Sequence, residues 1–228
     1  MDPSQHRAPT PRGRTCQDAA VSTRTVAILA FDDMEVLDFA GPYEVFNVAG
    51  ELGEGRPFEV VTVGLTGEPA VGRGGFTVLP DHRLDDCPPV DVLVVPGGAG
   101  TRRLLHDERL ATFLRERYDA VELLMSVCTG SMLLARAGLL AGRPATTHHT
   151  TFEELAAIDP SVVVERGSRF VHSGERLWTS AGVSAGIDLA LTVVEELAGP
   201  ATRAAAAAEM EWMWGSAGAE ARTAGCDA

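Results

Sequence analysis

Cys128 is the residue of this sequence whose surroundings best suit covalent chemistry. It lies in the segment Leu-Met-Ser-Val-Cys-Thr-Gly-Ser, residues 124–131, where a β-prone apolar run meets the start of a helix. A side chain on such a sharp turn is lifted out of the sheet at a helix N-terminus, where the positive end of the backbone dipole lowers the pKa of a thiol. A lone cysteine is more often a buried structural residue. The position at a strand end, followed by small residues that leave room for a substrate, favours a nucleophile.

Asp38 is the candidate proton carrier. It lies between Leu37 and Phe39, and Ala40-Gly41-Pro42 follow. A carboxyl group with apolar neighbours tends to be buried, and burial raises its pKa toward the range that is useful for proton transfer. The alternative is that Asp38 caps the following helix, and the residues alone favour the two interpretations equally. The nearby acids Asp32, Asp33 and Glu35 are interpreted as solvated loop residues.

A glycine-rich turn, Pro96-Gly97-Gly98-Ala99-Gly100, follows another apolar run. The backbone N–H groups of such a turn are exposed and can hold developing negative charge, as an oxyanion hole does. Turns of this kind are common between a strand and a helix. This one gains weight only because the neighbouring strand is expected to carry the cysteine.

The adjacent histidines His148 and His149 are a further candidate pair. Neighbouring residues on a strand point to opposite faces, so at most one of the two can reach a site. The other interpretation is that one ring packs under the sheet edge while the other meets water. The residues alone leave both possibilities open.

The elements that must position these side chains follow an α/β pattern. Short continuous apolar runs indicate strands covered on both faces, and longer stretches with apolar residues at helical spacing indicate helices. The expected strands are 25–31, 58–63, 91–95, 121–127, 145–147, 162–165 and 177–180, with a small hairpin at 72–79. The expected helices are 44–52, 104–117, 131–136, 152–157, 184–197 and 202–214.

Strands that alternate with helices imply right-handed crossovers and a mostly parallel sheet with helices on both faces. In such sheets, ligands bind beyond the carboxyl ends of the strands. That rule points to the turns after Phe31, Val95, Val127 and Ser180. Three of these turns hold the unusual residues described above.

Length and charge bound the class of protein. The chain has 228 residues, 45% of them hydrophobic and 22% charged, which is ordinary for a globular protein. We expect one domain from 25 to 214, a disordered N-terminal tail at 1–24 and a flexible C-terminal tail at 215–228. A net charge of -13 argues against nucleic-acid binding. The chain has no apolar run of the roughly 20 residues that cross a bilayer, so we expect no membrane partner.

The four cysteines form neither a C-x-x-C pair nor a cluster with histidine at metal-ligand spacing. This usage is typical of a reduced, cytoplasmic protein without a disulfide framework or a metal site. The N-terminal segment has no apolar stretch of the kind that a secretory signal needs. Cys87, which precedes two prolines, is interpreted as a structural residue.

Taken together, the motifs resemble the DJ-1/PfpI superfamily from about Val26 to Leu197. The matching segments are Leu37-Asp-Phe-Ala-Gly-Pro42, Asp91-Val-Leu-Val-Val-Pro-Gly-Gly98, Ser126-Val-Cys-Thr-Gly-Ser131, Gly138-Leu-Leu-Ala-Gly-Arg-Pro-Ala-Thr-Thr-His148 and Ser180-Ala-Gly-Val-Ser-Ala-Gly-Ile-Asp188. The resemblance implies a flavodoxin-like, class I glutamine amidotransferase-like α/β fold, a three-layer sandwich around a mostly parallel sheet. It also implies a homodimer, because the superfamily is commonly dimeric.

Within the superfamily, Cys-Thr-Gly together with Leu-Asp-Phe-Ala-Gly-Pro resembles the isonitrile (isocyanide) hydratase branch. That likeness implies that Cys128 is the nucleophile, that Asp38 and Thr129 are its essential neighbours, and that no metal or organic cofactor is needed. The residues expected to shape the substrate pocket are Gly97, Gly98, Val183 and His148.

Other members of the superfamily supply the alternatives. Protease-like and glyoxalase-like members place a histidine after the cysteine or pair the cysteine with glutamate, whereas this chain has Thr129 and Asp38, which argues against protease, glyoxalase or deglycase activity. The same motifs occur in ligand-sensing domains of AraC-type regulators. Only about thirty residues follow Leu197, so we expect no DNA-binding part. A non-catalytic sensor of small molecules or of oxidative stress remains the second hypothesis.

Overall fold

The computed structural model describes residues 22–212. Its centre is a seven-stranded sheet with the strand order β10-β11-β7-β6-β1-β2-β5. Every pairing in this sheet is parallel except that of β10 with β11. The tails expected at 1–24 and 215–228 lie outside the described residues except for positions 22–24, where β1 begins.

The strands of the main sheet are β1 (Arg24–Ala30), β2 (Phe58–Gly64), β5 (His82–Arg83), β6 (Val92–Val95), β7 (Leu123–Val127), β10 (Phe170–Gly174) and β11 (Leu177–Ser180). Two small pairs lie outside it, β3 (Ala70–Val71) with β4 (Thr77–Val78) and β8 (Pro144–Ala145) with β9 (Val163–Val164). The first of these pairs is antiparallel and corresponds to the hairpin predicted at 72–79, but its first strand lies just before that range.

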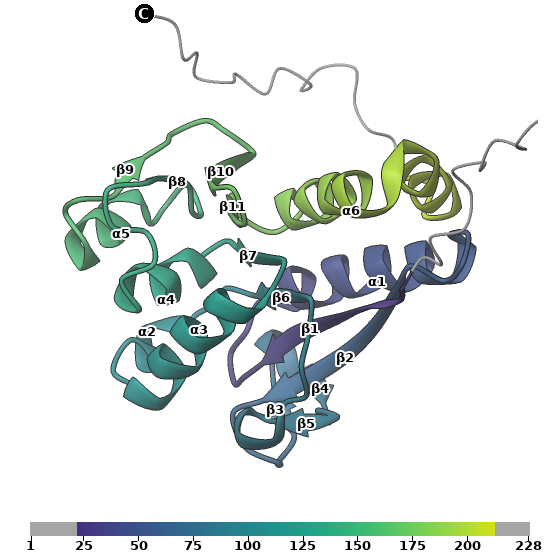
Figure 1. Cartoon of the computed structure of the whole chain (residues 1–228). Helices are drawn as coiled ribbons and strands as arrows, with labels where there is room; N and C mark the ends of the chain where they lie inside the picture. Colours follow the sequence, from purple (N-terminus) through teal and green to yellow (C-terminus); the bar gives the residue numbers. More distant parts are fainter. Residues whose placement is uncertain (1–21, 213–228) are drawn as a thin grey trace, which may run out of the picture.

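The helices are α1 (Val36–Leu52), α2 (Thr101–Leu104), α3 (Glu108–Ala120), α4 (Gly130–Arg136), α5 (Phe152–Ile158) and α6 (Ala185–Glu209), with short 3₁₀ turns at Arg73–Gly75 and Leu84–Asp86. Helices α1 and α6 cover one face of the sheet, and α3 and α4 cover the other (Figure 1). Alternate strand residues point into two separate cores: Val26 and Ile28 face α1 and α6, while Ala27 and Leu29 face α3 and α4. Both faces of β1 are therefore buried, as its continuous apolar run predicted.

Helix α1 begins earlier than predicted, at Val36 instead of near position 44, and it continues through Pro42. Proline within a helix removes a hydrogen bond and is normally unfavourable. Here packing outweighs propensity, because Phe39, Val45 and Phe46 of this helix are buried against the sheet and α6. This earlier start places Asp38 in the first helical turn.

The helix expected at 104–117 is two helices. Helix α2 ends at Leu104, and Asp107 begins α3 because its carboxylate accepts hydrogen bonds from the amides of Arg109 (2.9 Å) and Leu110 (3.1 Å). The two helices expected at the C-terminal end join as α6, in which Gly199 has φ 85° and interrupts the helical backbone.

Candidate active site

Cys128 occupies the turn between β7 and α4, as predicted, in a backbone conformation that is rare for cysteine. Its φ is +57°, in the left-handed region that residues with a Cβ seldom adopt. Hydrogen bonds hold the peptide on both sides. The Cys128 amide donates to the carbonyls of Ser180 (3.1 Å) and Ala181 (3.2 Å), and the Cys128 carbonyl accepts from the hydroxyl of Thr147 (3.0 Å). The surrounding strands and loops therefore maintain a strained turn, which is a common property of functional sites.

The ionisation of Cys128 differs from the prediction. Burial and the nearby charge of Asp38 raise the pKa of the thiol to about 12, although the amide and hydroxyl of Thr129 hydrogen-bond the sulfur and act in the opposite direction. Cys128 is only 6% exposed, so desolvation of a thiolate outweighs the helix N-terminus. The pKa of this thiol is therefore raised where the turn predicted a lowered one, and the sulfur keeps its proton until a base accepts it.

Asp38 is fully buried next to that thiol. Its carboxyl oxygens accept hydrogen bonds from the Gly97 amide (3.1 Å) and the Val183 amide (3.1 Å), and its side chain is hydrogen-bonded to Cys128. Burial raises the pKa of Asp38 from 3.8 to about 7. The helix-cap interpretation is wrong, because Glu35 holds the cap position of α1 and Asp38 bonds groups from distant loops.

Thr129 and the glycine-rich turn form one hydrogen-bonded unit. The Thr129 hydroxyl accepts a hydrogen bond from the Gly98 amide (2.9 Å) and lies 3.2 Å from the Thr101 hydroxyl. The amides of Gly97 and Gly98 thus hold Asp38 and Thr129, so the prediction that they form an oxyanion hole is wrong. Position 97 must be glycine for packing reasons, because a Cβ there would lie 2.5 Å from the Thr129 nitrogen and 2.9 Å from Asp38 Oδ2.

Val183 supplies the second amide to Asp38 from the turn between β11 and α6. Its φ is +54°, which is unfavourable for a β-branched residue and directs its N–H to the Asp38 carboxyl. Propensity could not have indicated this conformation. The predicted pocket residues Gly97, Gly98 and Val183 thus contact the Asp38–Thr129 group through their backbones.

His148 borders the same turn but does not behave as the strand pattern implied. It follows β8 without belonging to a strand, and its ring packs against Gly182. The rings of His148 and His149 lie 4.3 Å apart between centroids, so the two side chains share one side of the chain instead of opposite faces. Burial, together with the charge of His149, lowers the pKa of His148, and the Thr150 hydroxyl contacts its Nδ1 at 2.8 Å.

Glu35 is a site residue that the sequence did not reveal. Its side chain is only 20% exposed, and it pairs with Arg73 of the hairpin segment at 2.8 Å. The charge of Glu35 contributes to raising the pKa of both Asp38 and His148. Its interpretation as a solvated loop acid is therefore wrong, whereas Asp32 and Asp33 are exposed as expected. Only the docking of the hairpin, a tertiary contact, distinguishes Glu35 from its neighbours.

Comparison with known proteins places this chain in a family. The family model described as DJ-1/PfpI matches residues 24–196. The chain belongs to the DJ-1/PfpI family. This membership confirms the resemblance drawn from the motifs, and the mostly parallel sheet with helices on both faces is the flavodoxin-like fold of that family.

Relatives within the DJ-1/PfpI family differ in function. Isonitrile hydratase from Pseudomonas putida is 35% identical over 187 residues, which cover 82% of this chain and 78% of the relative. The transcriptional regulator GbdR of Pseudomonas aeruginosa is 29% identical over 75% of this chain but only 46% of its own length. A ThiJ/PfpI family protein from Pseudomonas syringae has a similar structure, with a TM-score of 0.76, 27% identity and coverage of 91% of this chain and 83% of that protein.

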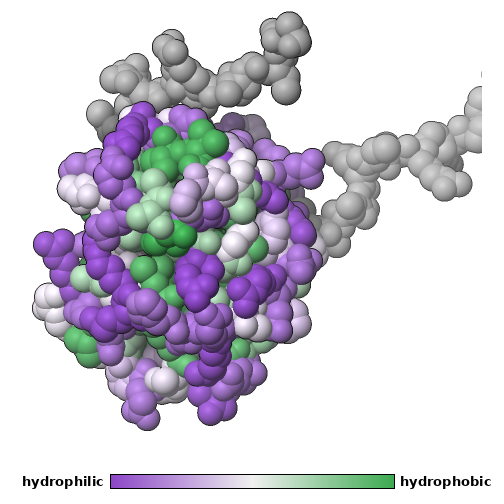
Figure 2. All heavy atoms as spheres, turned by 90° about the vertical axis from the view of Figure 1, so that its left-hand side faces the viewer, coloured by the Kyte–Doolittle hydropathy of each residue, from purple (hydrophilic) through white to green (hydrophobic). Residues whose placement is uncertain are grey.

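The site of this family member lies at the carboxyl ends of the strands, as the general rule for such sheets predicts. Strands β1 and β2 run toward the left-hand side in Figure 1, and Figure 2 faces that side. There a band of hydrophobic residues runs between hydrophilic ones (Figure 2). Between residues 22 and 212, no group of three or more His, Cys, Asp or Glu is arranged to hold a metal ion.

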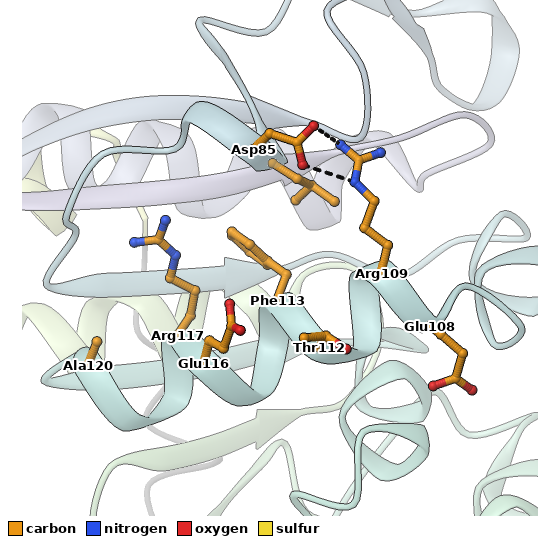
Figure 3. A pocket seen from close by; sticks show the side chains of 9 residues that line it. Asp85, Glu108, Arg109, Thr112, Phe113, Glu116, Arg117 and Ala120 are labelled. Atoms are coloured by element: carbon orange, nitrogen blue, oxygen red, sulfur yellow. Dashed lines mark hydrogen bonds and ion pairs between the residues drawn. The ribbon is translucent and has the colours of Figure 1, made fainter.

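A separate groove of about 740 Å³ is formed by the Leu84–Asp86 turn and α3 (Figure 3). An ion pair between Asp85 and Arg109 crosses it, and Arg117 lies over the Phe113 ring at 5.1 Å. None of the site residues described above lines this groove.

No helix in the described part of the chain is long and apolar enough to span a membrane.

Proposed function

We propose that this protein is an isonitrile hydratase, a lyase that adds water to an isocyanide R–NC and releases the N-substituted formamide. The observation that carries the proposal is the buried pair of Cys128 and Asp38. A thiol is hydrogen-bonded to a carboxyl whose pKa is about 7, so one group can attack carbon while the other moves protons near neutral pH. The 35% identity to the Pseudomonas putida isonitrile hydratase supports the same reaction class.

In the first step, the Cys128 sulfur attacks the terminal carbon of R–NC. Asp38, as carboxylate, takes the thiol proton and returns it to that same carbon, which carries the electron pair. One S–C bond and one C–H bond form, the carbon–nitrogen triple bond becomes double, and nothing leaves. The product is a thioimidate, R–N=CH–S, on Cys128. A thiol with a raised pKa suits this step because the proton that the carbon needs is stored on the sulfur.

In the second step, Asp38 removes a proton from water, and the hydroxide adds to the thioimidate carbon while the nitrogen gains that proton. Cleavage of the C–S bond then forms the formamide carbonyl, and the hydroxyl proton returns through Asp38 to the sulfur. Asp38 acts alternately as base and acid, which requires a pKa near the working pH. We propose that Thr129 keeps the sulfur and the glycine-rich turn in register through its bonds to both.

The backbone of the site also fits this reaction better than acyl transfer. Acyl transfer builds charge on an oxygen and needs free N–H donors around it. In this site the amides of Gly97 and Gly98 are already bound to side chains. Addition to an isocyanide places the developing charge on carbon, where the proton from Asp38 quenches it, so those two amides are not required for the substrate.

The test is incubation of the purified protein with a simple alkyl isocyanide, with the formamide followed by proton NMR. Cys128→Ala should remove turnover and leave the circular dichroism spectrum unchanged. The matched control is Cys87→Ala, because Cys87 is also buried but lies in the hydrophobic core away from Asp38, and its thiol contacts the Pro88 carbonyl. Absence of formamide from the wild type would contradict the proposal and favour the ligand-sensing hypothesis. Equal damage from both variants would show that the Cys128 effect is structural.

A further inference from the structure

Arg169, just before β10, braces the turn that carries Val183. The Arg169 carbonyl accepts a hydrogen bond from the Ala181 amide at 2.8 Å, which fixes the start of the turn. The Arg169 guanidinium contacts the Ser184 hydroxyl at 3.4 Å and forms an ion pair with Asp188, which fixes its end. One residue therefore holds both sides of a turn whose central residue has a strained backbone.

Asp188 holds the Arg169 guanidinium in place. It lies in the first turn of α6 and is only 8% exposed. One carboxyl oxygen accepts from Arg169, and the other accepts from the indole N–H of Trp212 at 3.0 Å. Because Trp212 lies beyond the end of α6, the carboxylate joins three distant parts of the chain. A buried carboxylate with cationic and neutral donors on both oxygens is a rigid attachment.

We infer that Arg169 is a positioning residue for Asp38: together with Asp188 it keeps Val183 in the left-handed conformation from which the Val183 amide reaches the Asp38 carboxyl. The effect on catalysis rests on the proposed function, but the positioning itself does not. A valine at φ +54° relaxes toward an ordinary conformation when its surroundings no longer oppose it. Relaxation would turn the N–H away from Asp38, which lies 3.1 Å from it.

The consequence for Asp38 has a definite sign. The groups that face the carboxyl are the Cys128 thiol, the amides of Gly97 and Val183, and the charge of Glu35 at the start of the same helix. The Val183 amide stabilises the carboxylate form and lowers the pKa of Asp38. Loss of that hydrogen bond should raise the Asp38 titration midpoint by about one pH unit. The reason is that a hydrogen bond stabilises a charged group by slightly more free energy than a shift of one pKa unit represents.

The experiment is a ¹³C NMR titration of the aspartate carboxyls in the full chain, with the Asp38 signal assigned by its absence from Asp38→Asn. Arg169→Met should move the Asp38 midpoint upward, and Arg169→Lys should restore part of the shift. The matched control is Arg166→Met: Arg166 belongs to the same segment but pairs with Glu153 and does not contact the turn. The Asp38 titration midpoint in Arg166→Met should equal that of the wild type.

Trp212→Phe keeps an aromatic ring but removes one donor to Asp188, so we expect a smaller upward shift of the Asp38 midpoint. An unchanged Asp38 midpoint in both folded variants would overturn the inference, whatever happens to the melting temperature. In the kinetic arm, Arg169→Met should lower kcat, leave KM nearly unchanged and move the acid limb of the pH profile upward. If the protein does not hydrate isocyanides, the NMR arm still decides the positioning role.

Discussion

For the single residues of the site, the pKa values of Cys128 and Asp38 determine what each can do. Burial raises the pKa of Asp38 to about 7 and the pKa of Cys128 to about 12, so at neutral pH the sulfur is protonated and the carboxyl is partly ionised. Oxidation by peroxide requires a thiolate. Both the enzyme and the oxidation sensor therefore need Asp38 to take the thiol proton before the sulfur reacts.

Replacement of Asp38 should separate two kinds of cysteine reactivity. Asp38→Asn removes the charge that helps to raise the pKa of Cys128, so alkylation by iodoacetamide at pH 8 should become faster than in the wild type. Isocyanide turnover should fall by at least ~10²-fold, because the proton carrier is gone. Asp33→Asn, at an exposed ion pair with Arg103, is the control. A parallel loss of alkylation and turnover would speak against the proton-carrier role.

The pKa of Asp38 also predicts how stability depends on pH. Its folded value of about 7 lies above the ordinary 3.8, so the folded state holds the proton more tightly than the unfolded state. The corresponding stability is fully present below pH 3.8 and is lost as the pH rises through about 7. The asparagine of Asp38→Asn does not titrate, so this variant keeps its stability as the pH rises while the wild type loses some. The free energy of unfolding of Asp38→Asn minus that of the wild type should therefore increase between pH 4 and 8, by up to about 4 kcal/mol.

Urea denaturation of both proteins at several pH values measures this difference. Asparagine can accept from only one of the two backbone amides that Asp38 binds, so Asp38→Asn should also lose some stability at every pH. This loss is the same at pH 4 and pH 8, so it does not affect how the difference between the two proteins changes with pH. A difference that stays flat from pH 4 to 8 would mean that the pKa of Asp38 is close to its ordinary value in the folded protein.

For the elements, the glycine-rich turn lies so close to two site residues that a side chain added to it should disturb the site. The glycine-rich turn after β6 contacts both Thr129 and Asp38, and a Cβ on Gly97 would meet each of them at less than 3 Å. We expect Gly97→Ala to lower turnover by more than about tenfold, since small misplacements of reacting groups have large effects. Steady-state kinetics measures the loss.

Gly67→Ala is the matched control for that variant. A Cβ on Gly67 would meet only the flexible side chain of Arg83, at 3.3 Å, and lies outside the site. Its turnover should equal that of the wild type. Similar losses in both variants would indicate that alanine at any glycine of these loops disturbs the fold, and that the contact at Gly97 is not special.

The elements also show which parts of the site could be predicted. Cys128 was placed on its turn because a buried strand, a cysteine and small residues are adjacent in the sequence. The raised pKa of its thiol was missed, because burial depends on α1, which is distant in the sequence. Strand β10 was missed because its exposed and partly buried residues do not alternate clearly.

For the whole molecule, the order of strands and helices was predictable because each buried strand is a continuous apolar run between turn residues. Helix boundaries were less accurate. The early start of α1 depends on packing against α6, and Gly41 shows how close that packing is: a Cβ there would lie 2.8 Å from Ile187. Local propensity contains no information about such a contact.

The homodimer expected from the superfamily stays a prediction at this scale. Val71, Phe76 and Leu79 of the hairpin region are large hydrophobic residues with exposures of 45%, 40% and 70%. Exposed apolar residues close together in a chain are common in interfaces. Light scattering should give twice the chain mass of 24.1 kDa. A mass of one chain at micromolar concentration would contradict the prediction.

The left-handed backbone at Cys128 has a consequence for thermal resistance. Glycine adopts φ +57° without strain, whereas any residue with a Cβ does not. Cys128→Gly should therefore unfold at a higher temperature than Cys128→Ala, by the equivalent of about 1 kcal/mol. Equal melting temperatures in calorimetry would show that the turn is relaxed. If the difference is found, the reactive cysteine at this position makes the protein less stable to heat than glycine would. Selection for stability alone would then favour glycine, which has no thiol.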